Sequence, residues 1–280
     1  MVSVFIPTKN EEKDLPGCLQ SVAWSDDIHV YDSNSTDSTV KIAEAAGARV
    51  TVRPAQDPQY FGGDESVHKN WALRNIAFKY PWVLHLDADE RTTPELVANV
   101  LQAVKDPGGH VAFQIQRRDF FLGTWLKHVQ ASPYYLRLFR PEKLHYERRI
   151  NPVSVVDGSS GTLGGFLDHY PFSKGLSHWV NRHNAYSTME AQQIIENRKA
   201  NRPFSLKAAF TETNFHERRF HQKELFYRLP ARPLIKFAIL YFGKRGLLDG
   251  KAGFTYAVLQ SFYEYMIVLK TQELETKQTS

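Results

Sequence analysis

Short apolar runs alternate with longer amphipathic segments along the first half of the chain. Apolar runs that predict strands lie at residues 2–6, 28–31, 49–52, 82–86, 111–115 and 135–139. Segments with helical spacing lie between the earlier runs, at 15–22, 36–46, 65–80 and 94–104. The alternation of strand and helix over residues 2–52 indicates βαβ units and a parallel sheet. We therefore expect an α/β fold.

Capping and breaking residues set the expected limits of these elements. Asn10 is placed to cap the first helix, and Thr93 followed by Pro94 is typical of a helix start. Segments rich in Pro, Gly, Gln or Ser predict loops. Two such loops are expected at 54–64 and 158–165. One long helix is expected at 176–200.

Carboxylates follow two of the predicted strands. The apolar run at 82–86 ends in Asp87-Ala88-Asp89, and the run at 28–31 ends at Asp32. Ligands of open α/β sheets bind beyond the carboxyl ends of the strands. Asp-x-Asp at such an end can offer two hard oxygen ligands to a divalent cation, which in turn holds a diphosphate. The alternatives are an acidic turn before the next helix and, for Asp32, an ordinary turn residue.

The composition and the absent motifs narrow the function further. The 280-residue chain is 42% hydrophobic and 13% aromatic, as expected of a folded protein. Its single cysteine, Cys18, excludes an internal disulfide and fits a reducing compartment. We expect neither a signal peptide nor a spanning helix, because no apolar run approaches about 18 residues. Gly-x-Gly-x-x-Gly and the P-loop are both missing, so a nucleotide would be held by carboxylates and a metal.

Positive charge is concentrated near the C-terminus. Residues 1–216 hold 24 Lys/Arg and 24 Asp/Glu, whereas residues 217–251 hold nine basic and three acidic residues. Aromatic and aliphatic residues alternate there with Arg218, Arg219, Lys223, Arg228, Arg232, Lys236, Lys244 and Arg245. This mixture favours a helix lying in an anionic membrane interface. The alternative is an ordinary amphipathic helix packed on the catalytic domain with a solvated basic face, and no nucleic-acid motif suggests a nucleic-acid partner.

Several of these segments carry a family resemblance. The segments 4–12, 30–39 and 86–91 resemble, in order and spacing, the family 2 glycosyltransferases of the GT-A fold. Later segments, at 136–140, 169–172 and 182–191, resemble the branch that builds bacterial lipopolysaccharide core and exopolysaccharide. The resemblance implies a Rossmann-like, mostly parallel central sheet flanked by helices, with a C-terminal helical extension.

The resemblance also implies a division of the chain. Residues 1–205 would form the catalytic domain, with a nucleotide-sugar half at about 1–110 and an acceptor half at about 111–205. Residues 206–280 would form the basic amphipathic extension.

The resemblance assigns nucleotide-binding and metal-binding roles to particular residues. Asp32 would bind the uracil or ribose, Lys69 would lie near the nucleotide or its phosphates, and Asp87 would contact the ribose or a metal-bound water. Asp89 would ligate Mn²⁺ or Mg²⁺, and His169 would complete the metal site. The alternative for His169 is a satisfied turn histidine. The base and ribose would be lined by Pro7, Thr8, Asn10 and Glu11.

The catalytic base is where the sequence departs from the family pattern. Relatives often carry His-Glu where this chain has Asn151-Pro152. The nearest carboxylates are Glu147 and then Asp157, and each is also expected to suit a surface salt bridge.

Together these features predict a metal-dependent, inverting transfer of a hexose from a nucleotide sugar, expected to be a UDP-sugar. The acceptor would be a glycan or lipid-linked glycan, reached from the cytoplasmic face of the membrane. The rival enzyme is a sugar-nucleotide nucleotidyltransferase, but residues 7–14 lack the glycine-rich loop of that class. A degenerate sugar-nucleotide-binding protein is the non-enzymatic alternative.

Overall fold

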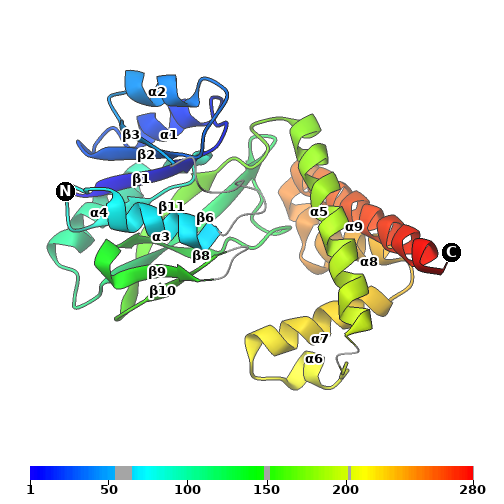
Figure 1. Cartoon of the computed structure of the whole chain (residues 1–280). Coiled ribbons are helices and arrows are strands. Elements are labelled where there is room, and N and C mark those ends of the chain that lie inside the picture. The colour runs from blue at the N-terminus through cyan, green and yellow to red at the C-terminus, as the bar shows by residue number, and fades with distance from the viewer. Residues whose placement is uncertain (54–64, 148–151, 201–202, 280) are drawn as a thin grey trace. The chain divides into compact units, whose positions relative to one another are not determined.

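The computed structural model describes residues 1–53, 65–147, 152–200 and 203–279, and it divides into two compact units. The sheet unit comprises residues 1–120 and 132–174, and the helical unit comprises 121–131 and 175–280 (Figure 1). These units are structural divisions, so the predicted functional domains at 1–205 and 206–280 stay predictions. The loop expected at 54–64 lies outside the described residues.

A mixed β-sheet forms the centre of the sheet unit. Its strands lie in the order β3-β2-β1-β4-β8-β6-β11-β5, and β1 pairs in parallel with both β2 and β4. A separate two-stranded hairpin joins β9 and β10. The strands are β1 Ser3–Thr8, β2 Ile28–Asp32, β3 Arg49–Val52, β4 Val83–His85, β5 Glu90–Thr92, β6 Ala112–Phe121, β8 Tyr134–Phe139, β9 Leu144–Glu147, β10 Val153–Val156 and β11 Ser160–His169.

Helices cover both faces of this sheet. They are α1 Leu15–Ser21, α2 Thr39–Ala45, α3 Glu65–Asn75 and α4 Pro94–Lys105, with a 3₁₀ turn η1 at Pro141–Lys143. Val4 and Ile6 of β1 pack in one core cluster with residues of α1 and α4, whereas Phe5 packs in the other with residues of α3. Successive side chains of a strand point to opposite faces, so a strand covered on both sides is apolar throughout. The predicted α/β class is confirmed.

Two local predictions were wrong, and one was confirmed. Thr93 caps α4 as expected, since its hydroxyl accepts a hydrogen bond from the Leu96 amide at 3.3 Å. Asn10 does not cap α1, because its backbone is left-handed (φ 55°) and its side chain binds Thr36 instead. The expected loop at 158–165 is largely strand, because β11 begins at Ser160, pairs Gly161 with Phe113 and holds Gly164 and Gly165 in a bulge.

The helical unit is built around its longest helix, α9 (Gly250–Thr279), which packs against α5 (Leu176–Lys199) and α8 (Arg232–Ala238). The remaining elements are β7 Thr124–Trp125, α6 Ala208–Thr211, α7 Phe215–Arg228, the π-helical turn η2 Ile239–Gly243 and the 3₁₀ turn η3 Gly246–Asp249. Asp249 ties residues 121–131 into this unit, because its carboxylate accepts the backbone amides of His128 and Val129 at 2.9 and 2.7 Å.

The basic C-terminal segment is not one interfacial helix. Between 215 and 251 the chain forms separate helical pieces, with left-handed residues at Ala231 and Arg245. Arg232, expected on a basic surface, is instead buried beside Glu264. Among the described residues, no helix has both the length and the apolar character needed to cross a membrane.

Candidate active site

Asp32 lies at the carboxyl end of β2, directly opposite Thr8 at the end of β1. Its carboxylate is 1% exposed and accepts hydrogen bonds from the Thr8 hydroxyl at 3.0 Å and the Ser35 amide at 2.7 Å. These contacts hold the turn after β2. The predicted contact of Asp32 with uracil or ribose stays a prediction. Pro7, half-buried in β1, lies opposite Tyr31.

The loops that follow β1 and β2 are hydrogen-bonded to each other. The Asn10 amide donates to the Ser35 hydroxyl at 2.8 Å, and the Asn10 side-chain oxygen accepts from the Thr36 amide at 2.8 Å. The Glu11 amide donates to the Thr39 hydroxyl at 2.7 Å. Three of the predicted nucleotide-binding positions, Thr8, Asn10 and Glu11, therefore sit on one ordered rim with Asp32.

The segment after β11 returns to this rim. Lys174 Nζ donates to the Asn10 carbonyl at 3.0 Å and to Glu11 Oε1 at 2.7 Å. The Tyr170 amide donates to the Asp89 carbonyl at 2.9 Å. Burial raises the pKa of Glu11 to about 7, although the Lys174 ammonium acts in the opposite direction. Lys174 and Tyr170, to which the sequence assigned no role, thus connect the loop of Asn10 and Glu11 with the turn that carries Asp89.

Asp87 is held by Arg137 of β8, a strand that pairs with β4. Arg137 Nη2 donates to Asp87 Oδ2 at 2.6 Å and to Glu90 Oε1 at 2.7 Å. Burial alone would raise the pKa of Asp87, but the Arg137 guanidinium outweighs it and holds that pKa well below its usual range. Glu90 is wholly buried, and burial raises its pKa despite the same guanidinium. Asp87 is therefore the carboxylate that stays ionised.

His85, Tyr146 and Lys69 form the wall beside Asp87. The Tyr146 hydroxyl lies 3.0 Å from His85 Nδ1, and His85 Nε2 lies 3.6 Å from Asp87 Oδ1. Burial lowers the pKa of His85 well below its usual value, with further lowering by Arg137, so its imidazole is neutral. Lys69 Nζ lies 5.2 Å from the centre of the Tyr146 ring, and its charge helps to lower the pKa of Asp87. The structure thus places Lys69 close to the strand-end carboxylates.

His169 bridges two carboxylates at the end of β11. Its Nε2 lies 3.1 Å from Asp89 Oδ2, and its Nδ1 lies 2.5 Å from Asp119 Oδ1. Sheet register explains the second contact, since His169 pairs with Asp119 of the neighbouring β6. Burial lowers the pKa of His169, but hydrogen bonds to Asp119 and Asp89 outweigh it and raise the pKa to about 9. His169 is a strand-end residue rather than a turn residue.

This donor set fits a divalent cation. A carboxylate oxygen and an imidazole nitrogen face each other, and Asp119 supports the far ring nitrogen as carboxylates do in metal–histidine sites. Within the described parts of the chain, no group of three or more His, Cys, Asp or Glu residues is placed to hold a metal ion by itself. Mg²⁺ and Mn²⁺ are often held by one or two protein ligands together with substrate phosphates and water. Asp89 and His169 match that kind of site.

The two proposed bases lie at opposite ends of the β9–β10 hairpin. Glu147 ends β9 and pairs with Val153, whereas Asp157 follows the other end of β10, where Val156 pairs with Leu144. Glu147 is 61% exposed and lies 3.1 Å from His145; Asp157 is 82% exposed and lies 2.9 Å from Lys143. Only Glu147 adjoins Tyr146, the residue that reaches His85. Side chains alternate along β9, so Glu147 points away from the face on which Tyr146 meets His85, and Glu147 and Asp157 both lie in surface ion pairs.

Arg137 and Asp119 are the site residues that sequence reasoning missed. Arg137 is a charged residue within the apolar run 136–139, and that interruption was an available signal. Asp119 carries no local signal, because its role comes from the pairing of β6 with β11.

Residues 3–161 match the family model described as Glycosyl transferase family 2. A glycosyltransferase of Rickettsia felis is 34% identical over 97% of this chain and 89% of its own length. The chain belongs to glycosyl transferase family 2. It is therefore a glycosyltransferase by family, and the nucleotidyltransferase alternative falls away. The GT-A fold that the resemblance implied is confirmed with it.

The chain is also similar to one further curated protein and to one solved structure. The lipopolysaccharide core biosynthesis glycosyltransferase LpsC of Rhizobium meliloti is 26% identical over 96% of this chain and 91% of its own. Glucosyl-3-phosphoglycerate synthase from Mycobacterium tuberculosis was solved with Mn²⁺, UDP-glucose and phosphoglyceric acid. It is 23% identical over 42% of this chain, with a TM-score of 0.35. The match covers 44% of that protein.

Proposed function

We propose that this family 2 glycosyltransferase is metal-dependent and inverting, and that it moves a hexose from a UDP-sugar to a glycan or lipid-linked glycan. The observation that carries the proposal is His169, held between Asp89 and Asp119 at the end of β11. It gives the strand-end Asp-x-Asp a nitrogen ligand on the opposite side, which an ordinary acidic turn would not need. Such a pair suits a cation that bridges protein and diphosphate.

Asp89 and His169 would hold the Mn²⁺ or Mg²⁺, and the bound cation would supply Lewis-acid stabilisation of the charge that grows on the leaving diphosphate. Asp119 would fix the His169 ring through Nδ1, so that Nε2 faces Asp89. Arg137 would keep Asp87 ionised and fixed through its 2.6 Å hydrogen bond, ready to contact the ribose or a metal-bound water.

The donor nucleotide would lie on the rim formed by the loops after β1 and β2. Asp32 with Pro7, Thr8, Asn10 and Glu11 supplies backbone and side-chain groups for the uracil and ribose. Lys69, near Asp87, would face the phosphates, where its ammonium offers charge-assisted hydrogen bonds.

Glu147 is the proposed base for deprotonating the acceptor hydroxyl, because it is the carboxylate nearest in sequence to Asn151-Pro152, where relatives often carry His-Glu. It is solvent-exposed, so an acceptor could reach it. A general base must come within hydrogen-bond reach of the proton it removes, and apo geometry does not exclude a candidate. Asp157 is the second candidate, at the other end of the same hairpin.

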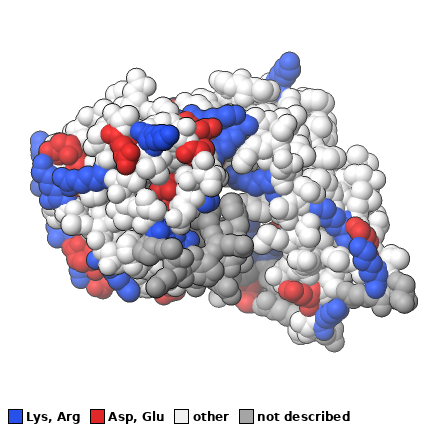
Figure 2. Space-filling view, turned by 45° about the horizontal axis from the view of Figure 1, so that its top comes forward, with Lys and Arg blue, Asp and Glu red and all other residues white. Residues whose placement is uncertain are grey.

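The acceptor proposal draws on the relatives and on the helical unit. The name of LpsC supports a role in bacterial surface polysaccharide biosynthesis. Exposed apolar side chains are frequent in the helical unit, and they include Phe210, Phe242, Leu248 and Phe254. On the face shown in Figure 2, charged residues of both signs are interspersed over the sheet unit, while uncharged side chains cover broad areas of the helical unit. We propose peripheral binding of this unit to the anionic inner face of the cytoplasmic membrane.

A donor panel tests the function. The melting temperature would be measured with UDP-glucose, UDP-galactose, GDP-mannose and free UDP, with Mn²⁺ and with EDTA. A ligand that binds only the native state raises the melting temperature. We expect UDP-sugars to stabilise the protein only with Mn²⁺, and turnover on deacylated glycan acceptors with the same donor. Stabilisation by GDP-sugars alone, or equal effects in EDTA, would contradict the proposal.

A further inference from the structure

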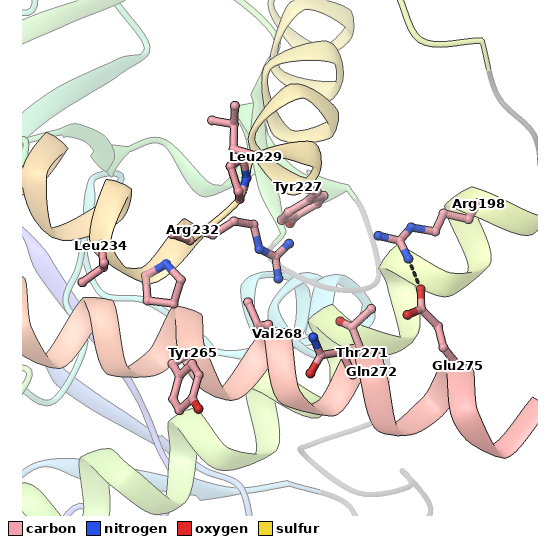
Figure 3. A pocket seen from close by; sticks show the side chains of 13 residues that line it. Arg198, Tyr227, Leu229, Arg232, Leu234, Tyr265, Val268, Thr271, Gln272 and Glu275 are labelled. Atoms are coloured by element: carbon pink, nitrogen blue, oxygen red, sulfur yellow. Dashed lines mark hydrogen bonds and ion pairs between the residues drawn. The ribbon is translucent and has the colours of Figure 1, made fainter.

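The helical unit contains a cavity that the proposed transfer does not use. Its volume is about 560 Å³, and it is lined by α5, by the turn between α7 and α8, and by α9 (Figure 3). Two arginines and one glutamate are its charged lining residues, namely Arg198, Arg232 and Glu275. Most of the remaining lining is apolar or aromatic.

Arg232 is 6% exposed, yet its side chain has few partners. Its Nε lies 3.4 Å from Glu264 Oε1, and its guanidinium lies 5.3 Å from the centre of the Tyr227 ring. Figure 3 shows the guanidinium between Tyr227 and α9. Its two terminal nitrogens make no hydrogen bond to any residue that the structure describes. A guanidinium carries five N–H donors in a planar fork that matches two oxygens of an anion. The cavity therefore presents a buried cation with donors to spare.

Arg198 adds a second cation to the same cavity. It pairs with Glu275, and its side chain is about half exposed (Figure 3). Burial lowers the pKa of Arg232, and the charge of Arg198 lowers it further. The two guanidiniums are therefore close enough to repel each other. An anion placed between them would relieve that repulsion.

The rim of the cavity continues into an apolar surface. Leu234, which is 70% exposed, and Tyr265 both line the cavity and face solvent. Tyr265 also belongs to a row of exposed residues on α9, here called the α9 stripe, which consists of Phe254, Val258, Phe262, Tyr265 and Leu269. Spacings of three and four residues place these side chains on one face of the helix. A ligand with an anionic head in the cavity could thus rest an apolar chain on this stripe.

We propose that the cavity binds the phosphate group of a phosphate-bearing amphiphile, whose aliphatic chain lies along the α9 stripe. A phosphate monoester has three terminal oxygens, so it can meet the forks of both Arg232 and Arg198. The amphiphile is favoured over a free anion because the cavity rim is apolar and opens onto the stripe. The binding site itself is argued from the cavity, and the inference rests on the proposed function only in taking the membrane as the natural source of the amphiphile.

Calorimetric titration with dodecyl phosphate, kept below its micelle concentration, tests the site. Two control ligands are titrated in the same way: inorganic phosphate carries the anionic head without the alkyl chain, and dodecyl maltoside carries the alkyl chain without the phosphate. We expect dodecyl phosphate to bind at one site per chain and the other two to bind far more weakly. Arg198→Gln and Arg232→Lys should each weaken dodecyl phosphate binding by about tenfold or more. Leu234→Ser should weaken dodecyl phosphate binding without changing that of inorganic phosphate.

Matched controls separate binding from folding. Arg232→Lys keeps a charge for Glu264, and each variant's melting temperature is compared with wild type. Lys277→Gln removes an exposed cation that is paired with Glu273, outside the cavity, and should bind dodecyl phosphate normally. UDP titration with Mn²⁺ on the same samples should be unaltered, so a failure of the transferase proposal would appear there and not in the dodecyl phosphate data.

Two results would overturn the inference. Equal binding of dodecyl phosphate and dodecyl maltoside would show that the head group is not recognised. Normal dodecyl phosphate binding by folded Arg198→Gln and Arg232→Lys would place the site elsewhere. Sedimentation velocity adds a third check on what covers the α9 stripe. A dimer that buries the stripe and persists in the presence of dodecyl phosphate would show that a second copy of the chain, rather than an aliphatic chain, covers it.

Discussion

Arg137 Nη2 lies 2.6 Å from Asp87 Oδ2 and 2.7 Å from Glu90 Oε1, so one buried nitrogen serves two carboxylates. Removing one member of a buried ionic group costs about 3–5 kcal/mol, since the remaining charges lose their partner. Arg137→Met should therefore lower the free energy of unfolding by about that amount. Chemical denaturation measures the loss. Lys143→Gln, which breaks the exposed pair with Asp157, should cost about 1 kcal/mol or less. Comparable losses in the two variants would contradict the assigned role of Arg137.

Asp89→Ala should abolish both transfer and the Mn²⁺-dependent part of UDP binding while leaving the protein folded. The reason is that Asp89 would supply the hard oxygen ligand opposite His169. Calorimetric titration of UDP with and without Mn²⁺ provides the measurement. Asp119→Asn, which leaves both ligands in place, should weaken metal-dependent binding by about 10–100-fold. Unchanged metal-dependent affinity in Asp89→Ala would remove Asp89 from the site.

Glu147→Gln should reduce kcat strongly and leave donor affinity nearly unchanged, because a base acts in the transition state. A loss of about 10²–10⁴-fold in kcat is expected for a general base. Steady-state kinetics and UDP titration separate the two effects. Asp157→Asn is the matched control at the other end of the hairpin. An inactive Asp157→Asn beside a normal Glu147→Gln would reverse the assignment.

Glu11 should make stability depend on pH. Its pKa is about 7 in the folded protein against an ordinary 4.5, so the folded state favours the protonated form. The stability that this group contributes is fully present below pH 4.5 and is lost as the pH rises through 7. Glu11→Gln should thus gain stability relative to wild type between pH 5 and 8, by about 1–3 kcal/mol. Denaturation curves at both pH values measure it, and parallel pH profiles of the two proteins would refute it.

Binding to anionic vesicles should depend on both charge and apolar surface in the helical unit. Changing Lys244, Arg245 and Lys251 to Gln together should weaken co-sedimentation, since each exposed cation near such a surface contributes about 1 kcal/mol. Phe242→Ser should weaken it at any salt concentration, whereas the charge contribution fades as salt rises. Equal binding to neutral and anionic vesicles would count against the membrane proposal.

The parts of the site that could be predicted from sequence are the ones that strand ends mark locally. Asp32, Asp87 and Asp89 each follow an apolar run, so their place at one edge of the sheet could be inferred before the structure. Arg137 and Asp119 depend instead on the pairing of β8 with β4 and of β6 with β11. Sequence spacing carries no information on which distant strands pair.

The C-terminal segment shows the same limit. Its charge excess and its apolar content were both visible, but their distribution between surface and interior was not. Arg232 was expected among exposed cations and lies buried beside Glu264, whereas Leu234, two residues later, is exposed. The face of α8 that is covered depends on α9, which lies almost entirely beyond the segment whose pattern suggested a membrane helix.

The number of residues in the β11 bulge determines which face of the sheet the His169 side chain occupies. Leu163 pairs with Ile115 and Phe166 with Gln116, so Gly164 and Gly165 are two residues without counterparts on β6. Alternation along a strand means that deleting one of them would turn the imidazole to the opposite face of the sheet, while deleting both would preserve its side. Gly165 resists simple substitution as well, since its φ is +83° and a Cβ there would lie 2.7 Å from the Leu96 backbone. His169 can thus face Asp89 only while the bulge holds an even number of extra residues, as it does with Gly164 and Gly165.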